Sequence, residues 1–190
     1  MELKPLIGIC GAAGSGKDTL AEGIARIDVY FVYHFADPIK AAINAMFGLS
    51  PAQWHDREWK EAQLDWLNVS PRYLAQTLGT EWGRDLVDQQ IWLKVAQHKY
   101  SLIADRAQLR AGRVVGMGMI IPDVRFPNEA KWIKDEGGIL FEVNRPGIEP
   151  VAQHASEDAD LSPWIDYTIL NDGPPSQMIG NARELIWQAS

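Results

Sequence analysis

The sequence contains a single cysteine among 190 residues, and it has no run of about 20 apolar residues such as a bilayer-spanning helix requires. A lone Cys10 forms no internal disulfide and supplies no cysteine cluster for a metal, which is typical of a reducing compartment. The apolar run after Pro5 is too short for a signal peptide and leads directly into glycines. We therefore expect a cytoplasmic protein with no membrane partner.

Positive charge is also scarce. The chain has 18 Lys and Arg against 25 Asp and Glu, a net charge of −7. Broad nucleic-acid binding depends on many cations that neutralise phosphates, so we expect no nucleic-acid partner, although isolated basic residues can hold a mononucleotide. The length suits one domain, residues 1–190, and leaves a homodimer open.

Strand-like and helix-like segments alternate along the chain. The expected strands are residues 5–10, 29–35, 114–122, 138–143 and 167–170. The expected helices are residues 17–26, 37–47, 71–78, 85–102 and 128–135, with a last helix ending near residue 187. Gly79, Thr80 and Gly83 are expected to separate the third helix from the fourth. This alternation predicts an α/β fold with a mostly parallel sheet flanked by helices in three layers.

A glycine-rich loop follows the first expected strand, with the sequence Gly11-Ala-Ala-Gly-Ser-Gly-Lys-Asp-Thr19. Its spacing is that of the P-loop, whose backbone amides surround phosphates beside a helix N-terminus and a mobile lysine. The residues expected to bind the phosphates of ATP are Gly11, Ala13, Gly14, Ser15, Gly16, Lys17, Asp18 and Thr19. Asp18 stands where the motif has a hydroxyl, so either Asp18 or Thr19 is expected to hold Mg²⁺.

Further polar segments follow in order. They are Asp37-Pro-Ile-Lys40, Arg72 to Arg84, Ile91-Trp92, Pro122 to Glu129, and Arg145-Pro-Gly147. Arg72 and Gln76 are four residues apart and share a helix face, so they suit one phosphate. Asp123 and Arg125 follow the most apolar strand, at the edge where doubly wound sheets bind ligands.

These segments, with the Gly-Lys-Asp-Thr ending of the loop, resemble the deoxynucleoside monophosphate kinases of tailed bacteriophages. The resemblance runs from about Ile7 to Leu185 and is weakest over residues 48–69 and 104–113. It implies the fold of nucleoside monophosphate kinases, with a helical excursion over about 48–84 that covers the acceptor and a lid over about 145–161. For a phage protein, the compartment would be the host cytoplasm.

The resemblance also implies roles for individual residues. Lys40, Arg72 and Arg125 would approach the acceptor monophosphate, with Gln76, Thr80, Trp92 and Glu129 around its base and sugar. Lys17, Arg72, Asp123 and Arg125 would be catalytic, while Arg145, Asn171 and Gly173 would lie on the ATP side. Six of these residues have a structural alternative: solvated charges for Lys40 and Arg72, caps or turns for Gln76, Thr80 and Asp123, and core packing for Trp92.

The expected reaction is ATP- and Mg²⁺-dependent phosphorylation of a deoxynucleoside monophosphate, which yields ADP and a deoxynucleoside diphosphate. One alternative is a P-loop kinase for dephospho-coenzyme A, phosphomevalonate or a sugar acid. A sugar-acid kinase needs a carboxylate to take the hydroxyl proton, whereas a monophosphate needs converging cations. The other alternative is a nucleotide-binding regulatory module, but the Asn-Lys-x-Asp guanine-reading sequence is missing.

Overall fold

The computed structural model describes residues 6–28, 30–109, 118–148 and 160–189, without the side chains of residues 104–109. The chain divides into two compact units. The first comprises Met1–His34 and Lys99–Ser190, and the second comprises Phe35–His98. The excursion expected over 48–84 falls within the second unit. Most of the lid expected over 145–161 lies outside the described residues.

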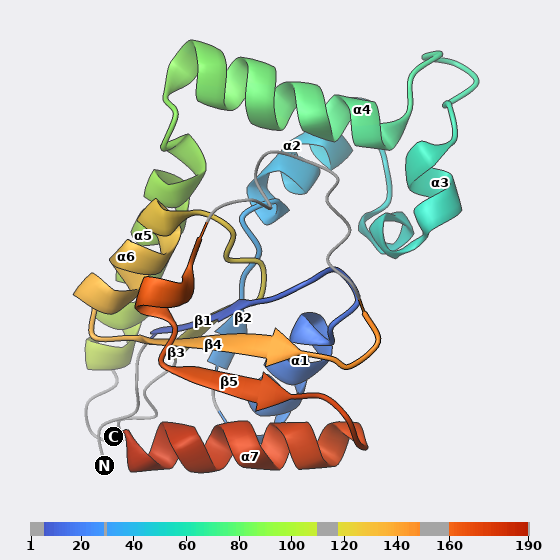
Figure 1. The fold of residues 1–190 in the computed structure, drawn as a ribbon. Coiled ribbons are helices and arrows are strands. Elements are labelled where there is room, and N and C mark those ends of the chain that lie inside the picture. The colour runs from blue at the N-terminus through green and yellow to red at the C-terminus, as the bar shows by residue number, and fades with distance from the viewer. Residues whose placement is uncertain (1–5, 29, 110–117, 149–159, 190) are drawn as a thin grey trace. The chain divides into compact units, whose positions relative to one another are not determined.

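A five-stranded parallel sheet forms the centre of the first unit (Figure 1). Its strands are β1 (Leu6–Cys10), β2 (Tyr30–Val32), β3 (Gly118–Ile121), β4 (Ile139–Asn144) and β5 (Tyr167–Leu170), in the spatial order β2-β3-β1-β4-β5. Every neighbouring pair is parallel. The predicted α/β class and parallel sheet are therefore confirmed. They were predictable because strands that are buried on both faces read as continuous apolar runs.

Helices cover both faces of this sheet. Alternate residues of β1 point to opposite faces. Ile7 and Ile9 join a core with α1 (Lys17–Ile27) and α7 (Pro175–Gln188). Gly8 points the other way and lies against Ile133 of α6 (Pro127–Asp135). Cys10 is free and buried, and burial raises the pKa of its thiol to about 12, so it is a core residue and not a nucleophile.

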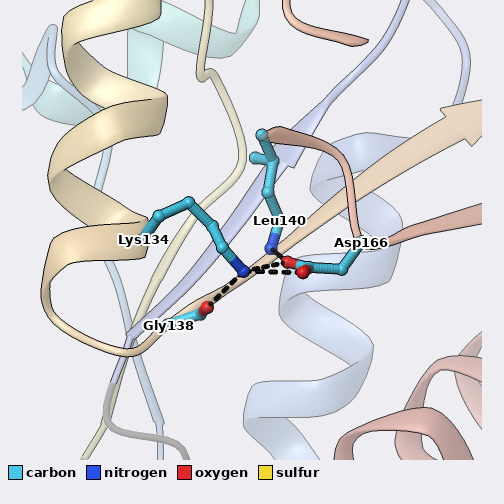
Figure 2. Close-up of polar contacts among 4 residues, drawn as sticks. All are labelled: Lys134, Gly138, Leu140 and Asp166. Carbon is cyan, nitrogen blue, oxygen red and sulfur yellow. Dashed lines mark hydrogen bonds and ion pairs between the residues drawn. The ribbon is translucent and has the colours of Figure 1, made fainter. Parts of the chain in front are cut away.

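A polar clasp joins α6 to the start of β4 and β5 (Figure 2). Lys134 Nζ lies 2.6 Å from both carboxylate oxygens of Asp166 and donates to the carbonyl of Gly138 at 3.1 Å. Asp166 Oδ2 also accepts the backbone N–H of the buried Leu140 at 2.8 Å. The clasp fixes the C-terminal end of α6 to the sheet.

Removing the carboxylate of Asp166 should destabilise the fold. In Asp166→Ala the amide of Leu140 loses its acceptor inside the core, so the free energy of unfolding should fall by about 2 kcal/mol. Urea denaturation would measure it. The matched control is Asp135→Ala, whose carboxylate pairs with Lys131 on the exposed surface of α6 and should change stability by less than about 0.5 kcal/mol. Equal stability losses in the two variants would contradict a structural role for the clasp.

The second unit is helical. It contains α2 (Asp37–Phe47), a 3₁₀-helix (Pro51–His55), α3 (Arg57–Glu61), α4 (Pro71–Gln76) and the first part of α5 (Ile91–Leu109). A π-helix, η2 (Thr77–Val87), continues directly from α4. The predicted break at residues 79–83 is therefore wrong, and the chain leaves the helix only at Asp88. The two glycines allow close packing there and do not form a turn, because a side chain at Gly83 would collide with Trp92.

Other boundaries also differ from the expectations. β2 ends at Val32, earlier than expected, although Tyr33 still donates its N–H to Ile120. α5 begins at Ile91 and reaches Leu109, so it starts and ends later than the helix expected over residues 85–102. Residues 114–117, expected to begin the third strand, lie outside the described residues. Among the described helices, none combines the length and apolar character needed to cross a membrane.

Candidate active site

The phosphate loop lies at the point where the sheet changes its winding direction. β1 and β3 are neighbours, but α1, which follows β1, and α6, which follows β3, cover opposite faces. Loops that leave adjacent strands in opposite directions open a crevice at their carboxyl ends, where α/β proteins bind ligands. The N–H of Val124 donates to the carbonyl of Ile9 at 3.2 Å and ties the loop after β3 to β1. Residues 11–19 and 122–126 therefore lie next to each other at this edge of the sheet.

The loop has the backbone that an anion site requires. Gly11, Gly14 and Gly16 have positive φ angles of 134°, 77° and 106°, which turn amides inward in a way that other residues rarely adopt. A side chain at Gly11 would also come within 2.4 Å of the carbonyl of Val143 in β4. Gly16 is the N-cap of α1, whose first amides point toward the loop and favour negative charge.

Lys17 lies over the loop and adds a positive charge to the partial charges of its amides. Its Nζ donates to the carbonyls of Gly11 and Ala12, both at 2.7 Å. Burial lowers the pKa of Lys17 below its ordinary value; the carboxylate of Asp18 opposes this effect and the guanidinium of Arg125 adds to it. Arg125, in the loop after β3, therefore lies near enough for its charge to act on Lys17.

Asp18 has a neighbour that the sequence did not reveal. His34 Nε2 lies 3.2 Å from Asp18 Oδ1, and the aspartate side chain is largely exposed. His34 follows β2 at the same carboxyl edge of the sheet, a position that could have identified it as a site residue. Thr19 is exposed beside Asp18.

The donor groups near the loop suit magnesium. The described residues contain no group of three or more His, Cys, Asp or Glu side chains placed as a metal site. Mg²⁺ is commonly held by one or two protein oxygens together with substrate phosphates and water. Asp18 and Thr19 supply hard oxygen atoms at the first turn of α1, so the residues present fit this ion.

Two segments from the C-terminal half, which contain residues predicted for the ATP side, lie against the loop. Asn171 Nδ2 donates to the carbonyl of Ser15 at 2.7 Å, and Arg145 Nη1 lies 3.4 Å from the carbonyl of Gly14. Ser15 is buried, and its Oγ makes no hydrogen bond within the described part of the chain. Gly173 lies just before α7 and next to the side chain of Gln177.

The loop after β3 holds Asp123 and Arg125 between the sheet and α6. Asp123 is half-buried and Arg125 is exposed. Glu129, expected near the acceptor, is buried, and its Oε2 accepts the backbone amides of Arg125 at 2.9 Å and Phe126 at 3.1 Å. Such a carboxylate at the third position of the helix satisfies the amides of the N-cap and of the residue before it, and it fixes the backbone that carries Arg125.

The remaining acceptor residues belong to the second unit. Arg72 and Gln76 are exposed on α4, Thr80 is exposed on η2, and Lys40 is partly exposed in the first turns of α2. Arg72 Nε pairs with Glu61 Oε1 at 2.5 Å, and both side chains are about half exposed. Ion pairs this exposed are weak, so an incoming phosphate can replace the carboxylate.

Trp92 is placed differently from the other acceptor residues. It is 8% exposed, and its indole N–H donates to the carbonyl of Gly79 at 2.7 Å. The core-packing alternative therefore describes its surroundings. Its contact with Gly79 was not evident from the sequence, since nothing in the pattern relates residue 92 to residue 79.

Known proteins resemble the chain in both sequence and fold. The family model described as deoxynucleotide monophosphate kinase matches residues 56–179. A putative deoxynucleotide monophosphate kinase of Acanthamoeba polyphaga mimivirus is 35% identical over 157 residues, 80% of each chain. The deoxynucleoside-5'-monophosphate kinase of Escherichia phage T5 is 25% identical over 87% of this chain and 89% of the phage protein.

Among solved structures, the APS kinase of Mycobacterium tuberculosis aligns with a TM-score of 0.50 over 98% of this chain and 99% of its own. At 15% identity this similarity shows the P-loop kinase fold alone. The family model covers more than half of the sequence, and the mimivirus relative supports it independently. The chain belongs to the deoxynucleotide monophosphate kinase family.

Proposed function

We propose that this protein transfers the γ-phosphoryl group of ATP to deoxynucleoside monophosphates, producing ADP and deoxynucleoside diphosphates in the cytoplasm. One observation carries the proposal: in a member of this family, the phosphate loop and the Asp123–Arg125 loop lie next to each other at the carboxyl edge of the sheet. The electrostatic effect of Arg125 on Lys17 supports it.

The donor phosphates would bind to the amides of residues 11–19, with Lys17 moving from the carbonyls of Gly11 and Ala12 to the β- and γ-phosphates. Asn171 and Arg145, which hold the loop carbonyls at Ser15 and Gly14, would keep the loop in shape beside the nucleotide. Mg²⁺ would be held by Asp18 or Thr19, and when bound it neutralises phosphate charge. Asp123 would orient water or phosphate from the loop after β3.

The acceptor phosphate would bind to Lys40, Arg72 and Arg125. These residues are cations, as a doubly ionised phosphate requires, and none of the three is fully buried. Gln76 and Thr80 would lie near the sugar and base. Glu129 would not contact the acceptor itself but would position Arg125, because its carboxylate accepts the backbone N–H of Arg125.

Phosphoryl transfer to a monophosphate does not require a general base. The attacking phosphate oxygen is already ionised at neutral pH, so catalysis would come from alignment and from positive charge around the transferred group. This favours a phosphate acceptor over the alcohol of a sugar acid, because an alcohol needs a general base. Dephospho-coenzyme A and phosphomevalonate are the rival acceptors that the assay must include.

The test is direct. Purified protein is incubated with ATP, Mg²⁺ and one acceptor at a time: dAMP, dGMP, dCMP, dTMP, the matching ribonucleotides, dephospho-coenzyme A and phosphomevalonate. We expect ADP and a deoxynucleoside diphosphate in equal amounts from at least one deoxynucleotide. ATP binding without transfer to any deoxynucleotide would reject the proposal, and transfer to a rival acceptor would replace it.

A further inference from the structure

Trp92 supports the π-helix from its buried side. Its N–H bond to the carbonyl of Gly79 spans 2.7 Å in a buried environment. At Gly83, one turn later, a side chain would lie 2.6 Å from Cζ2 of the same indole. The ring therefore fills the space that two glycines leave open, and it makes a directional bond to one of them.

The opposite side of this helical turn is exposed to solvent. Gly79 and Gly83 are buried, whereas Thr80 between them is exposed, as is Gln76 just before them. The N–H of Asp88 donates to the carbonyl of Gly83, five residues back, which is the wide spacing of a π-helix. π-Helices are rare, and this one continues for 11 residues, so it needs support from outside its own backbone.

Gly79 also receives a side chain from α2. A Cβ at Gly79 would lie 3.0 Å from Cδ1 of Ile39, the residue before Lys40. The Gly79 turn thus packs against the helix that carries Lys40 and against the indole that holds its carbonyl. A change in the width of this turn would shift Thr80 relative to Lys40.

We propose that Trp92 is a positioning residue: it fixes the wide helical turn at Gly79–Gly83 and thereby sets Thr80 and Gln76 for the acceptor nucleotide. This revises the role implied by the family resemblance, in which the indole itself surrounds the base. The ring is buried and its only hydrogen-bond donor is already used. The part that concerns the acceptor rests on the proposed function, whereas the part that concerns the turn does not.

The key variant is Trp92→Phe, which keeps an aromatic ring but removes the N–H. Two quantities are measured: hydrogen exchange of the amides of residues 77–87 in the free protein, and the Michaelis constants for the acceptor and for ATP. We expect exchange to become at least about fivefold faster and the acceptor KM to rise about fivefold, because a buried carbonyl loses its donor. The KM for ATP should change by less than about twofold.

Two further variants frame the result. Gly83→Ala should change both quantities in the same direction, because its methyl group would displace the indole. Trp187→Phe is the control, since that indole is 58% exposed on α7, and it should change neither quantity. Circular dichroism verifies that each variant is folded.

The outcomes separate the alternatives. Unchanged exchange in both Trp92→Phe and Gly83→Ala would overturn the proposal. A raised acceptor KM with unchanged exchange would also overturn it and would place the indole against the acceptor. Should the wild type phosphorylate no deoxynucleotide, the proposed function would fail. The hydrogen-exchange measurement would then still test whether Trp92 fixes the helical turn at Gly79–Gly83.

Discussion

Lys17→Met should lower kcat at least about 10²- to 10³-fold, the usual effect of removing one preorganised group that stabilises charge in the transition state. The side chain lies across the loop on the carbonyls of Gly11 and Ala12, within reach of any phosphate held by the loop amides. Methionine keeps the length and apolar stem but removes the charge. The measurement is initial-rate kinetics with ATP and the best deoxynucleotide.

A surface lysine supplies the control for Lys17. Lys131→Met removes a charge from an exposed pair with Asp135 on α6 and should leave kcat unchanged. A Lys17→Met protein that is folded and retains more than about a third of wild-type kcat would exclude this lysine from the transfer step. The affinity for ATP, measured by titration, should also fall in the Lys17→Met variant, because the lysine would contact the phosphates in the ground state as well.

Arg125→Ala should reduce kcat about 10²- to 10³-fold while the KM for ATP changes by less than about threefold. Arg125 is exposed in the loop after β3, which lies beside the phosphate loop, and its positive charge contributes to the lowered pKa of Lys17. Its interactions should therefore grow as charge moves from donor to acceptor and should matter little when ATP binds alone. Arg125→Lys should recover only part of the loss, because an ammonium group lacks the planar two-pronged donor geometry.

The control for Arg125 is Arg26→Ala, which removes an exposed guanidinium paired with Glu22 on α1. Both KM values and kcat should stay at wild-type levels. If Arg125→Ala instead raises the KM for ATP and leaves kcat intact, Arg125 belongs to nucleotide binding and the assignment of the acceptor side fails.

The sequence predicted the parts of the fold in which a local pattern determines the structure. β4 and β5 begin and end within a residue of the expected bounds, because short runs rich in apolar and β-branched residues, flanked by glycines or polar residues, define strands. The phosphate loop was equally predictable, since Gly11, Gly14 and Gly16 are required by backbone angles that few other residues adopt.

What the sequence could not predict depends on contacts between distant residues. Gly79 and Gly83 suggested a break because glycine weakens an isolated helix, but their packing against Ile39 and Trp92 decides their structure. The contact of His34 with Asp18 and that of Asn171 with Ser15 likewise join segments far apart in the chain. A local pattern has no signal for such pairs. The joint placement of the acceptor residues stays a prediction.

The central position of β1 has a consequence for synthesis of the protein. Leu6 pairs with Met119 in β3 and Ile7 pairs with Ile139 in β4, so the first strand to leave the ribosome acquires both partners only after most of the chain has been made. Until then this buried five-residue strand lacks the two strands that flank it in the sheet. A nascent chain cut short before β4 would carry the complete glycine sequence and still lack the scaffold that shapes it, so nucleotide affinity should arise late and abruptly during translation.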